Sequence, residues 1–236
     1  MYKRIILKLS GEALAGDRND VRFDNGVIAG IVEQIKTVLL GGTEVALVIG
    51  GGNFWRGRSA DSQMDRTRAD QIGMLATVMN AIYVADFLRQ VGVEAVVQTP
   101  FRCGTMTEEF SKDTALHHLQ AGRVVIFAGG LGHPFFSTDT ITALRGAELG
   151  ADALFFAKNV DGVYDDDPAK NPAAKKIETI ACRDIVQHNL KVIDLTAASM
   201  CFEQKIPVVI FGLNEENSII RAVGGEKIGT IVTVED

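Results

Sequence analysis

Apolar residues occur along the chain in short runs that alternate with longer segments of helical periodicity. Runs rich in Val, Ile and Phe predict strands at residues 4–9, 45–49, 94–98, 123–128, 153–157, 207–211 and 230–234. The segments between them predict helices at residues 26–40, 69–91, 108–120, 138–150 and 194–204. Because such strands are typical of sheets buried on both faces, we predict an α/β fold. It is a three-layer αβα sandwich with a central, mainly parallel sheet of about eight strands, formed by residues 1–236 as a single domain.

Three segments stand out from the alternation of strands and helices. In the helix predicted at residues 69–91, apolar side chains recur at helical spacing and exceed what one sheet face needs, which is compatible with a subunit contact; they are Ile72, Leu75, Ala76, Met79, Ile82 and Tyr83. Residues 10–25 are polar and contain glycine, and they predict a hairpin or flap. Residues 160–182 hold two prolines and many charges, and they predict an irregular lid or binding loop.

Composition narrows the functional classes. The chain has 236 residues and a net charge of −6, which argues against a broad nucleic-acid surface. Its three cysteines are widely spaced and form no CxxC motif, so we expect reduced thiols and a cytoplasmic location. The four histidines show no metal-ligand spacing, and no apolar run is long enough to predict a membrane span.

The stretch "ALVIGGGNFWRG" is a predicted strand that ends in three glycines at 50–52. Glycines at a strand end let backbone N–H groups surround an anion, although a plain strand-to-helix turn is the alternative. Neither the P-loop nor the dinucleotide spacing is present. Arg56 in the same loop and Lys8 in the first strand, before Ser10 and Gly11, are the candidate cations. A lysine in an apolar strand needs a partner, unless that strand is an edge from which it reaches solvent.

A further glycine-rich turn, "AGGLGHPFFSTDT", leads from a predicted strand into a predicted helix. Ser137 and Thr138 stand where a helix N-cap is expected, and the N–H groups of such a helix start also bind phosphate. The alternative is a cap and nothing more. Phe135 and Phe136 favour a pocket, because a nucleobase or sugar needs a flat apolar wall.

Five motifs together resemble the bacterial uridylate kinase (UMP kinase) family of the amino-acid-kinase superfamily, which has a carbamate-kinase-like fold. They are "KLSGEAL", "VIGGGNFWRG", "DQIGMLATVMNA", "GHPFFSTD" and "NVDGVYDDDP", and the resemblance covers residues 2 to 234. It implies transfer of the γ-phosphoryl group of ATP to UMP, giving ADP and UDP, in pyrimidine nucleotide (CTP and UTP) biosynthesis. It also implies Mg²⁺ carried by ATP, with no metal site on the protein.

The resemblance carries over to individual residues. The catalytic set is Lys8, Arg56, Asp139 and Asp194, with the two aspartates holding the lysine. The ATP-binding set is Lys8, Leu9, Ser10, Gly11, Gly52, Arg56, Lys158, Asn159, Tyr164 and Asp167, where either Lys158 or Asn159 meets adenine. The UMP-binding set is Gly51, Asp70, Leu131, Gly132, His133, Pro134, Phe135, Phe136, Ser137 and Thr138. Simpler roles stay open for Asp194 as an N-cap and for Asp70 as a charge at a helix start.

The resemblance further implies a homohexamer, a trimer of dimers. The N-terminal half would serve mainly UMP and subunit contacts, and the C-terminal half mainly ATP. UTP as an inhibitor and GTP as an effector are implied too, with no nucleic-acid polymer or membrane as partner. Two departures weaken the expectation for GTP: charged residues in "AGDRNDVRFD", where relatives are glycine-rich, and Ala85, where several relatives have an arginine.

Three other functions fit parts of the pattern. A kinase that makes acyl phosphates from glutamate, aspartate or carbamate would share the fold, but the PFFxT segment speaks against it. A non-catalytic nucleotide-binding or oxyanion-storage protein would keep the glycine turns without needing Lys8 beside Asp194. A nicotinamide oxidoreductase would need the GxGxxG motif, which this chain lacks.

Overall fold

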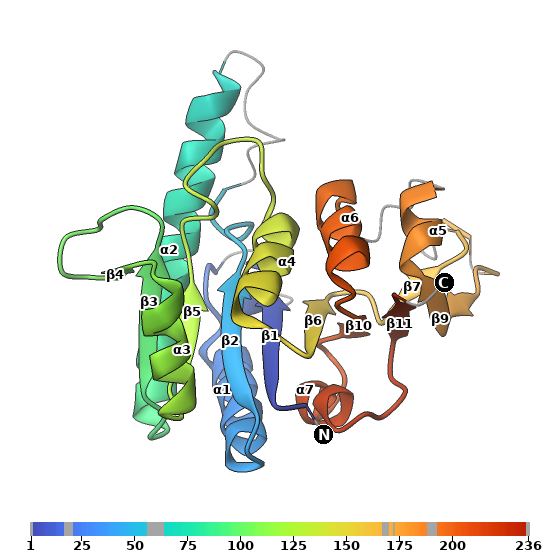
Figure 1. Ribbon diagram of the computed structural model, residues 1–236, viewed down its shortest axis with the longest axis horizontal. Helices are drawn as coiled ribbons and strands as arrows, with labels where there is room; N and C mark the ends of the chain where they lie inside the picture. The colour runs from blue at the N-terminus through green and yellow to red at the C-terminus, as the bar shows by residue number, and fades with distance from the viewer. Residues whose placement is uncertain are drawn as a thin grey trace.

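The computed structural model describes residues 2–16, 21–55, 64–166, 170–171, 173–187 and 193–234 (Figure 1). Over these residues, nine strands form one sheet in the order β4-β3-β5-β2-β1-β6-β10-β11-β9. Neighbouring strands run parallel except β10 and β11, which are antiparallel. The predicted α/β fold with a mainly parallel sheet is therefore confirmed, with nine strands rather than about eight.

All seven predicted strands are confirmed to within one or two residues. The sheet consists of β1 (Arg4–Leu9), β2 (Glu44–Ile49), β3 (Ala95–Thr99), β4 (Glu108–Glu109), β5 (Val124–Phe127), β6 (Ala153–Lys158), β9 (Thr179–Ala181), β10 (Val208–Gly212) and β11 (Thr230–Thr233). The short outer strands β4 and β9 were not predicted, because they form by hydrogen bonding to a sheet edge rather than by burial. The helix predicted from residue 108 was wrong at its start, because residues 108–109 form β4.

Helices cover both faces of the sheet. One face packs against α1 (Asn25–Leu40), α2 (Arg66–Gln90) and α7 (Ser218–Val223). The other packs against α3 (Lys112–Gln120), α4 (Thr138–Leu149), α5 (Cys182–Gln187) and α6 (Leu195–Gln204). Since side chains alternate along a strand, Ile5 and Leu7 of β1 enter the first core and Ile6 the second. Lys8 therefore points to the side of α4.

The first of the two segments outside the alternation contains a 3₁₀ helix where a hairpin or flap was predicted, and its residues 17–20 lie outside the described residues. The 3₁₀ helix η1 (Glu12–Ala15) follows β1, and Asp24 caps α1 by accepting hydrogen bonds from the N–H groups of Gly26 (2.9 Å) and Val27 (3.1 Å). In the later segment, β7 (Val163–Tyr164) and β8 (Lys176–Ile177) form an antiparallel pair. The prediction of an irregular loop over residues 160–182 was therefore wrong for these strands and for β9.

The apolar stripe noted on α2 is only partly covered by the fold: Ala76 is buried and Ile82 and Tyr83 pack against the core. Ile72, Leu75 and Met79 are 38%, 54% and 47% exposed. The residues of α2 that are buried are Ala69, Ala76, Thr77, Val78, Asn80, Ala81, Val84, Ala85 and Leu88. By length and composition α2 is apolar enough to cross a membrane, but here it packs against α1, β2, β3 and β5 as a helix of the fold.

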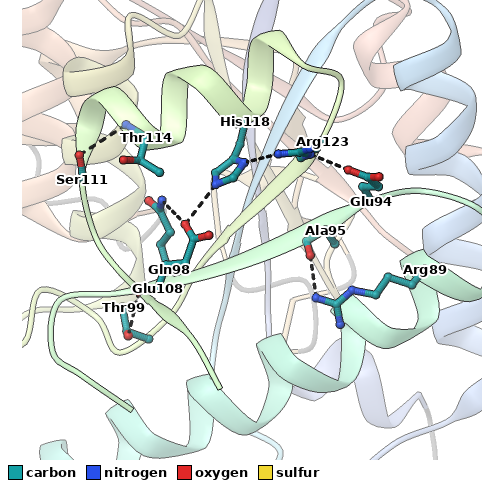
Figure 2. A network of polar contacts seen from close by, with 10 residues as sticks. All are labelled: Arg89, Glu94, Ala95, Gln98, Thr99, Glu108, Ser111, Thr114, His118 and Arg123. Atoms are coloured by element: carbon teal, nitrogen blue, oxygen red, sulfur yellow. Dashed lines mark hydrogen bonds and ion pairs between the residues drawn. The ribbon is translucent and has the colours of Figure 1, made fainter. Parts of the chain in front are cut away.

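A chain of polar contacts, which we call the edge network, ties α3 to the outer strands (Figure 2). The guanidinium of Arg123 pairs with Glu94 (2.5 Å) and donates to Nδ1 of His118 (3.1 Å). Since that nitrogen accepts, the other ring nitrogen carries the hydrogen and donates to Glu108 (3.1 Å). Gln98 also donates to Glu108, at 3.2 Å. Each charge in this network therefore has an opposite charge or a neutral group beside it.

Candidate active site

Lys8 lies at the carboxyl end of β1, a central strand between β2 and β6. Only 8% of the residue is exposed, and its Nζ is 3.1 Å from Oδ1 of Asp139. Asp139 belongs to the first turn of α4, which Ser137 caps by accepting from the N–H groups of Asp139 (3.0 Å) and Thr140 (3.3 Å). The edge-strand alternative for Lys8 was therefore wrong, because β1 is a central strand and the half-buried carboxylate of Asp139 is the partner of Lys8.

Asp194 has the capping role considered for it, and the structure shows no direct contact between its carboxylate and Lys8 within the described residues. It caps α6 by accepting from the N–H of Ala197 (2.9 Å). The same carboxylate accepts from the hydroxyls of Thr140 (3.0 Å) and Ser137. Asp194 thus joins the starts of α4 and α6, which lie side by side (Figure 1). Within the described residues, its polar contacts go to these groups, whereas Asp139 makes the ion pair with Lys8.

The glycine turns after β1 and β2 touch each other. The N–H of Gly50 donates to the carbonyl of Leu9 at 2.9 Å. A Cβ added to Gly11 would lie 2.6 Å from the carbonyl oxygen of Gly50, closer than real Cβ atoms come. One added to Gly51 would lie 2.9 Å from the carbonyl oxygen of Gly73 on α2. Glycine is thus required where the two turns and α2 meet, close to Lys8.

Two polar residues of α2 hold glycine turns in place. Asn80, which is fully buried, donates to the carbonyl of Gly50 at 2.6 Å and exchanges hydrogen bonds with Asn53. One turn earlier, the hydroxyl of Thr77 accepts from the N–H of Gly129 at 2.8 Å. Sequence reasoning missed these residues; the available signal was the presence of polar side chains within an apolar helix.

A cavity of about 150 Å³ lies between α2 and the turn that leads from β5 to α4. It is lined by Gly51, Trp55, Ala69, Asp70, Gly73, Met74, Thr77, Gly130, His133, Phe136, Ser137 and Thr138. Six of these residues are in the predicted UMP-binding set, and they come from three separate segments of the chain. The structure thus brings them together, whereas Trp55, Met74 and Thr77 were not predicted.

Asp70 does more than favour a helix start. One of its carboxylate oxygens accepts from the N–H of Phe135 at 2.9 Å, and the other accepts from the guanidinium of Arg66 at 2.9 Å. Phe135 has a φ of 73°, a left-handed conformation that is rare and costly for a bulky side chain. Such strain persists only where surrounding contacts enforce it, and Asp70 supplies one of these contacts from α2.

A larger depression of about 530 Å³ lies between α4 and α6. It is lined by Leu144, Ala147, Leu195, Thr196, Ser199, Met200, Glu203 and Gln204, none of which was predicted for the site. Its lining offers no cation and no glycine turn, so it lacks the groups that bind phosphate. The smaller cavity, which is lined by glycine turns and a helix start, is therefore the better candidate for the substrate site.

The predicted ATP-binding residues fall into two groups. Leu9, Ser10, Gly11 and Gly52 lie in the touching turns, while Tyr164 lies in the β7–β8 pair and donates to Asp161 at 2.7 Å. That hydrogen bond, together with Lys176 at 3.1 Å, lowers the pKa of Asp161. Asn159 is exposed and Lys158 is half-buried at the end of β6. Arg56 and Asp167 lie outside the described residues.

The site carries charge suited to an anion, with little that suits a protein-held metal. Over the described residues, no three His, Cys, Asp or Glu side chains group closely enough to hold a metal ion. Asp139 is paired with Lys8, and Asp194 is occupied by the first turns of two helices. These donors fit a divalent cation bound mainly by phosphates and water better than one bound by a protein cage.

Comparisons with known proteins agree with this geometry. The model of the amino acid kinase family matches residues 3–212. A solved UMP kinase from Bacillus anthracis is 35% identical, with a TM-score of 0.94 over 100% of this chain and 97% of that one. A UMP kinase from Ureaplasma parvum is 34% identical, with a TM-score of 0.91 over 99% of both chains. A uridylate kinase from Archaeoglobus fulgidus is 26% identical, with a TM-score of 0.75 over 97% of this chain and 99% of that one.

These matches confirm the resemblance that the five sequence motifs indicated, and they extend it over the whole length of the chain. The family match also covers the touching glycine turns, α2 and the first turn of α4, where the candidate site lies. The chain belongs to the amino acid kinase family.

Proposed function

We propose that this protein is a UMP kinase, which transfers the γ-phosphoryl group of ATP to UMP and releases ADP and UDP. The observation that carries the proposal is the position of the candidate UMP cavity. Gly51 and the first turn of α4, including Ser137 and Thr138, line that cavity. The adjacent Gly50 and Asp139 touch the Ser10–Gly11 turn and Lys8. An acceptor in the cavity would therefore meet a donor phosphate at Lys8.

The reaction asks for alignment and positive charge rather than covalent chemistry from the protein. An ionised phosphate oxygen of UMP attacks the γ-phosphorus, and the bond between that phosphorus and the β,γ-bridging oxygen breaks. The bridging oxygen keeps the electron pair and leaves as part of ADP. No general base is needed, because the attacking oxygen carries no proton. Lys8, held by Asp139, would stabilise the negative charge that develops on the transferring group.

The remaining residues have supporting roles in this proposal. Asp70 would bind UMP, while the turn from Leu131 to Thr138 would surround its phosphate and base, with Phe136 as the apolar wall. The β7–β8 pair with Tyr164 would border the adenosine, together with Lys158 or Asn159. Arg56 would help Lys8 to neutralise the transferring group. Mg²⁺ would arrive with ATP and screen the charge of its phosphates.

Assembly, regulation and location complete the proposal. The exposed Ile72, Leu75 and Met79 of α2 offer a surface for subunit contact, which suits the homohexamer that the resemblance implies. The N-terminal half would then serve UMP and subunit contacts, and the C-terminal half ATP. UTP as an inhibitor, GTP as an effector and a cytoplasmic location are parts of the same proposal.

A substrate screen tests the proposed function. A coupled assay measures ADP release from ATP with UMP, CMP or dUMP, and with glutamate, aspartate or carbamate, in the presence and absence of GTP and UTP. We expect UDP from UMP at a rate above that for every other acceptor. Faster phosphorylation of an amino acid or carbamate, or ATP binding without turnover of UMP, would refute the proposal.

A further inference from the structure

Lys158 lies on the same face of the sheet as Lys8, one step nearer to the carboxyl edge. In the register of the parallel pair β1–β6, Lys8 stands beside Phe156. Residues two apart on a strand share a face and are separated by about 6.6 Å. Phe156 enters the core beneath α4 and α6, so Lys158 leaves β6 toward the starts of these helices. Asn159 follows it and is exposed, whereas Lys158 is half-buried.

The surroundings of Lys158 are those of Lys8. Burial lowers the pKa of the Lys158 ammonium, the charge of Asp139 raises it, the charge of Lys8 lowers it further, and that of Asp194 raises it. The pKa is lowered overall, so the destabilisation of the charged form by burial and by Lys8 exceeds its stabilisation by the two carboxylates. Two ammonium groups and two carboxylates thus form one cluster, which we call the site cluster, at the starts of α4 and α6.

The chemistry of this cluster suits a phosphate chain better than a nucleobase. Adenine is neutral and is usually recognised by apolar walls and a few hydrogen bonds. Burial is the largest cause of the lowered pKa of Lys158, and a multiply charged anion beside it would stabilise its charged form. The triphosphate of ATP is such an anion, and its terminal phosphate is the part proposed to meet Lys8.

We infer that Lys158 is a second catalytic lysine, which contacts the terminal phosphate of the donor nucleotide rather than its adenine. This inference rests on the proposed function and adds a residue to the same site. In the step, the bond from the UMP oxygen to the γ-phosphorus forms and the bond to the β,γ-bridging oxygen breaks. Lys158 stays protonated throughout and stabilises the charge that moves toward ADP. Asn159 is then the remaining candidate for adenine.

The first test compares nucleotides that differ only in the terminal phosphate. Calorimetry would measure the binding of ADP and of a non-hydrolysable ATP analogue, each with Mg²⁺, to wild type, Lys158→Met and the exposed control Lys112→Met. We expect Lys158→Met to lower the affinity for the ATP analogue by at least about tenfold, because a charge-assisted hydrogen bond is lost. The affinity for ADP should fall by clearly less. Equal losses for both nucleotides would place Lys158 at a part that ADP and ATP share, the adenosine or the first two phosphates, and would overturn the inference.

The second test separates catalysis from structural support. Lys158→Met should lower kcat for UDP formation by at least about tenfold, while the unliganded protein melts at no lower temperature than wild type. Lys158→Arg should recover part of kcat, because its charge is retained. An unchanged kcat in Lys158→Met would overturn the inference, and so would a lowered melting temperature with kcat equal in the Met and Arg variants.

The two proposals can fail separately. The binding comparison uses no UMP, so it assigns Lys158 whether or not the wild type phosphorylates UMP. Wild type could make no UDP while Lys158→Met still lowers the affinity for the ATP analogue more than that for ADP. In that case the proposed acceptor is wrong and the assignment of Lys158 stands. If UDP forms normally in both proteins, the proposed function stands and the inference fails.

Discussion

The site cluster and the edge network both combine acidic and basic side chains, but they arrange them differently. In the edge network, Glu94, Arg123, His118 and Glu108 follow one another so that no like charges meet (Figure 2). In the site cluster, Lys8 and Lys158 act on each other as like charges, at partly buried positions. A network without like-charge neighbours supports the fold, whereas two neighbouring ammonium groups at a strand end are suited to binding an anion.

Removing Lys8 should have the largest effect and should leave the fold intact. We expect Lys8→Met to lower kcat for UDP formation by at least about 100-fold, because an electrostatic stabiliser of the transferring group is lost. Its circular dichroism spectrum should match that of wild type, since Met fills a similar volume on β1. Turnover near the wild-type level would contradict the role given to Lys8 and would make the site cluster structural, like the edge network.

Asp70 sharpens the comparison by separating the acceptor from the donor. Asp70→Ala loses the contact to the N–H of Phe135, on the turn that lines the cavity. We expect KM for UMP to rise by about tenfold, the effect of losing one charge-assisted hydrogen bond, with little change in KM for ATP. Steady-state kinetics with each substrate varied in turn measures both constants. A change confined to the KM for ATP would place Asp70 on the donor side.

The edge network should respond in stability and not in turnover. Arg123→Met leaves Nδ1 of the buried His118 without its donor and removes the pair with Glu94. We expect a loss of about 1 kcal/mol in the free energy of unfolding, because one partner of a buried hydrogen bond is missing. Urea unfolding measures it, and kcat should stay within about twofold, since a surface pair contributes little at a distance. A large fall in kcat would mean that the two regions are coupled.

The pH dependence of stability distinguishes the regions again. Folding lowers the pKa of Lys158 from its ordinary value of 10.5. At pH values between the folded-state pKa and 10.5, the unfolded chain therefore binds more protons at this residue than the folded chain does. The free energy of unfolding of wild type should therefore rise, relative to Lys158→Met, as the pH increases through that window. Urea titrations of both proteins at several alkaline pH values measure the difference. A difference that stays flat or falls would contradict the strained environment of Lys158.

The smallest expected effect is a difference in reactivity among the three cysteine thiols. Burial raises the pKa of Cys201, on α6 near the site cluster, to about 12, and burial also raises that of Cys182. Cys103, in the connection between β3 and β4, is half-buried. A thiol reagent at pH 8 should label Cys103 first and the other two only on unfolding, because the thiolate is the reactive form. Mass spectrometry locates the label, and early labelling of Cys201 would mean that α6 opens readily.

The sequence predicted the elements whose signal is burial. The runs at residues 4–9 and 153–157 are apolar throughout, so their central place in a parallel sheet followed from composition. Lys8 was identifiable for the same reason, since an ammonium in an apolar strand requires a partner, and Asp139 provides it. The short strands β4 and β9 could not be predicted, because hydrogen bonding to a sheet edge leaves no hydrophobic pattern.

Other features depended on tertiary contacts that periodicity does not record. Ile72, Leu75 and Met79 on α2 form a stripe as apolar as a core face, yet they are exposed. Small residues such as Ala81 are buried instead. Asn80 gave no sign that it holds Gly50, because a polar residue in a helix can equally face water. Lys158 appeared beside the adenosine motif in the sequence, and only the register of β6 with β1 brings it to Lys8.

The most direct measurement of the account is the binding of a single ligand in which adenosine and uridine are joined through five phosphates. If donor and acceptor meet end to end over Lys8, this ligand should bind far more tightly than ATP or UMP alone, because one association places both nucleotides. It should exclude both substrates and lose most of its advantage in Lys8→Met. Binding no tighter than ATP, with UMP still able to bind alongside, would contradict the account.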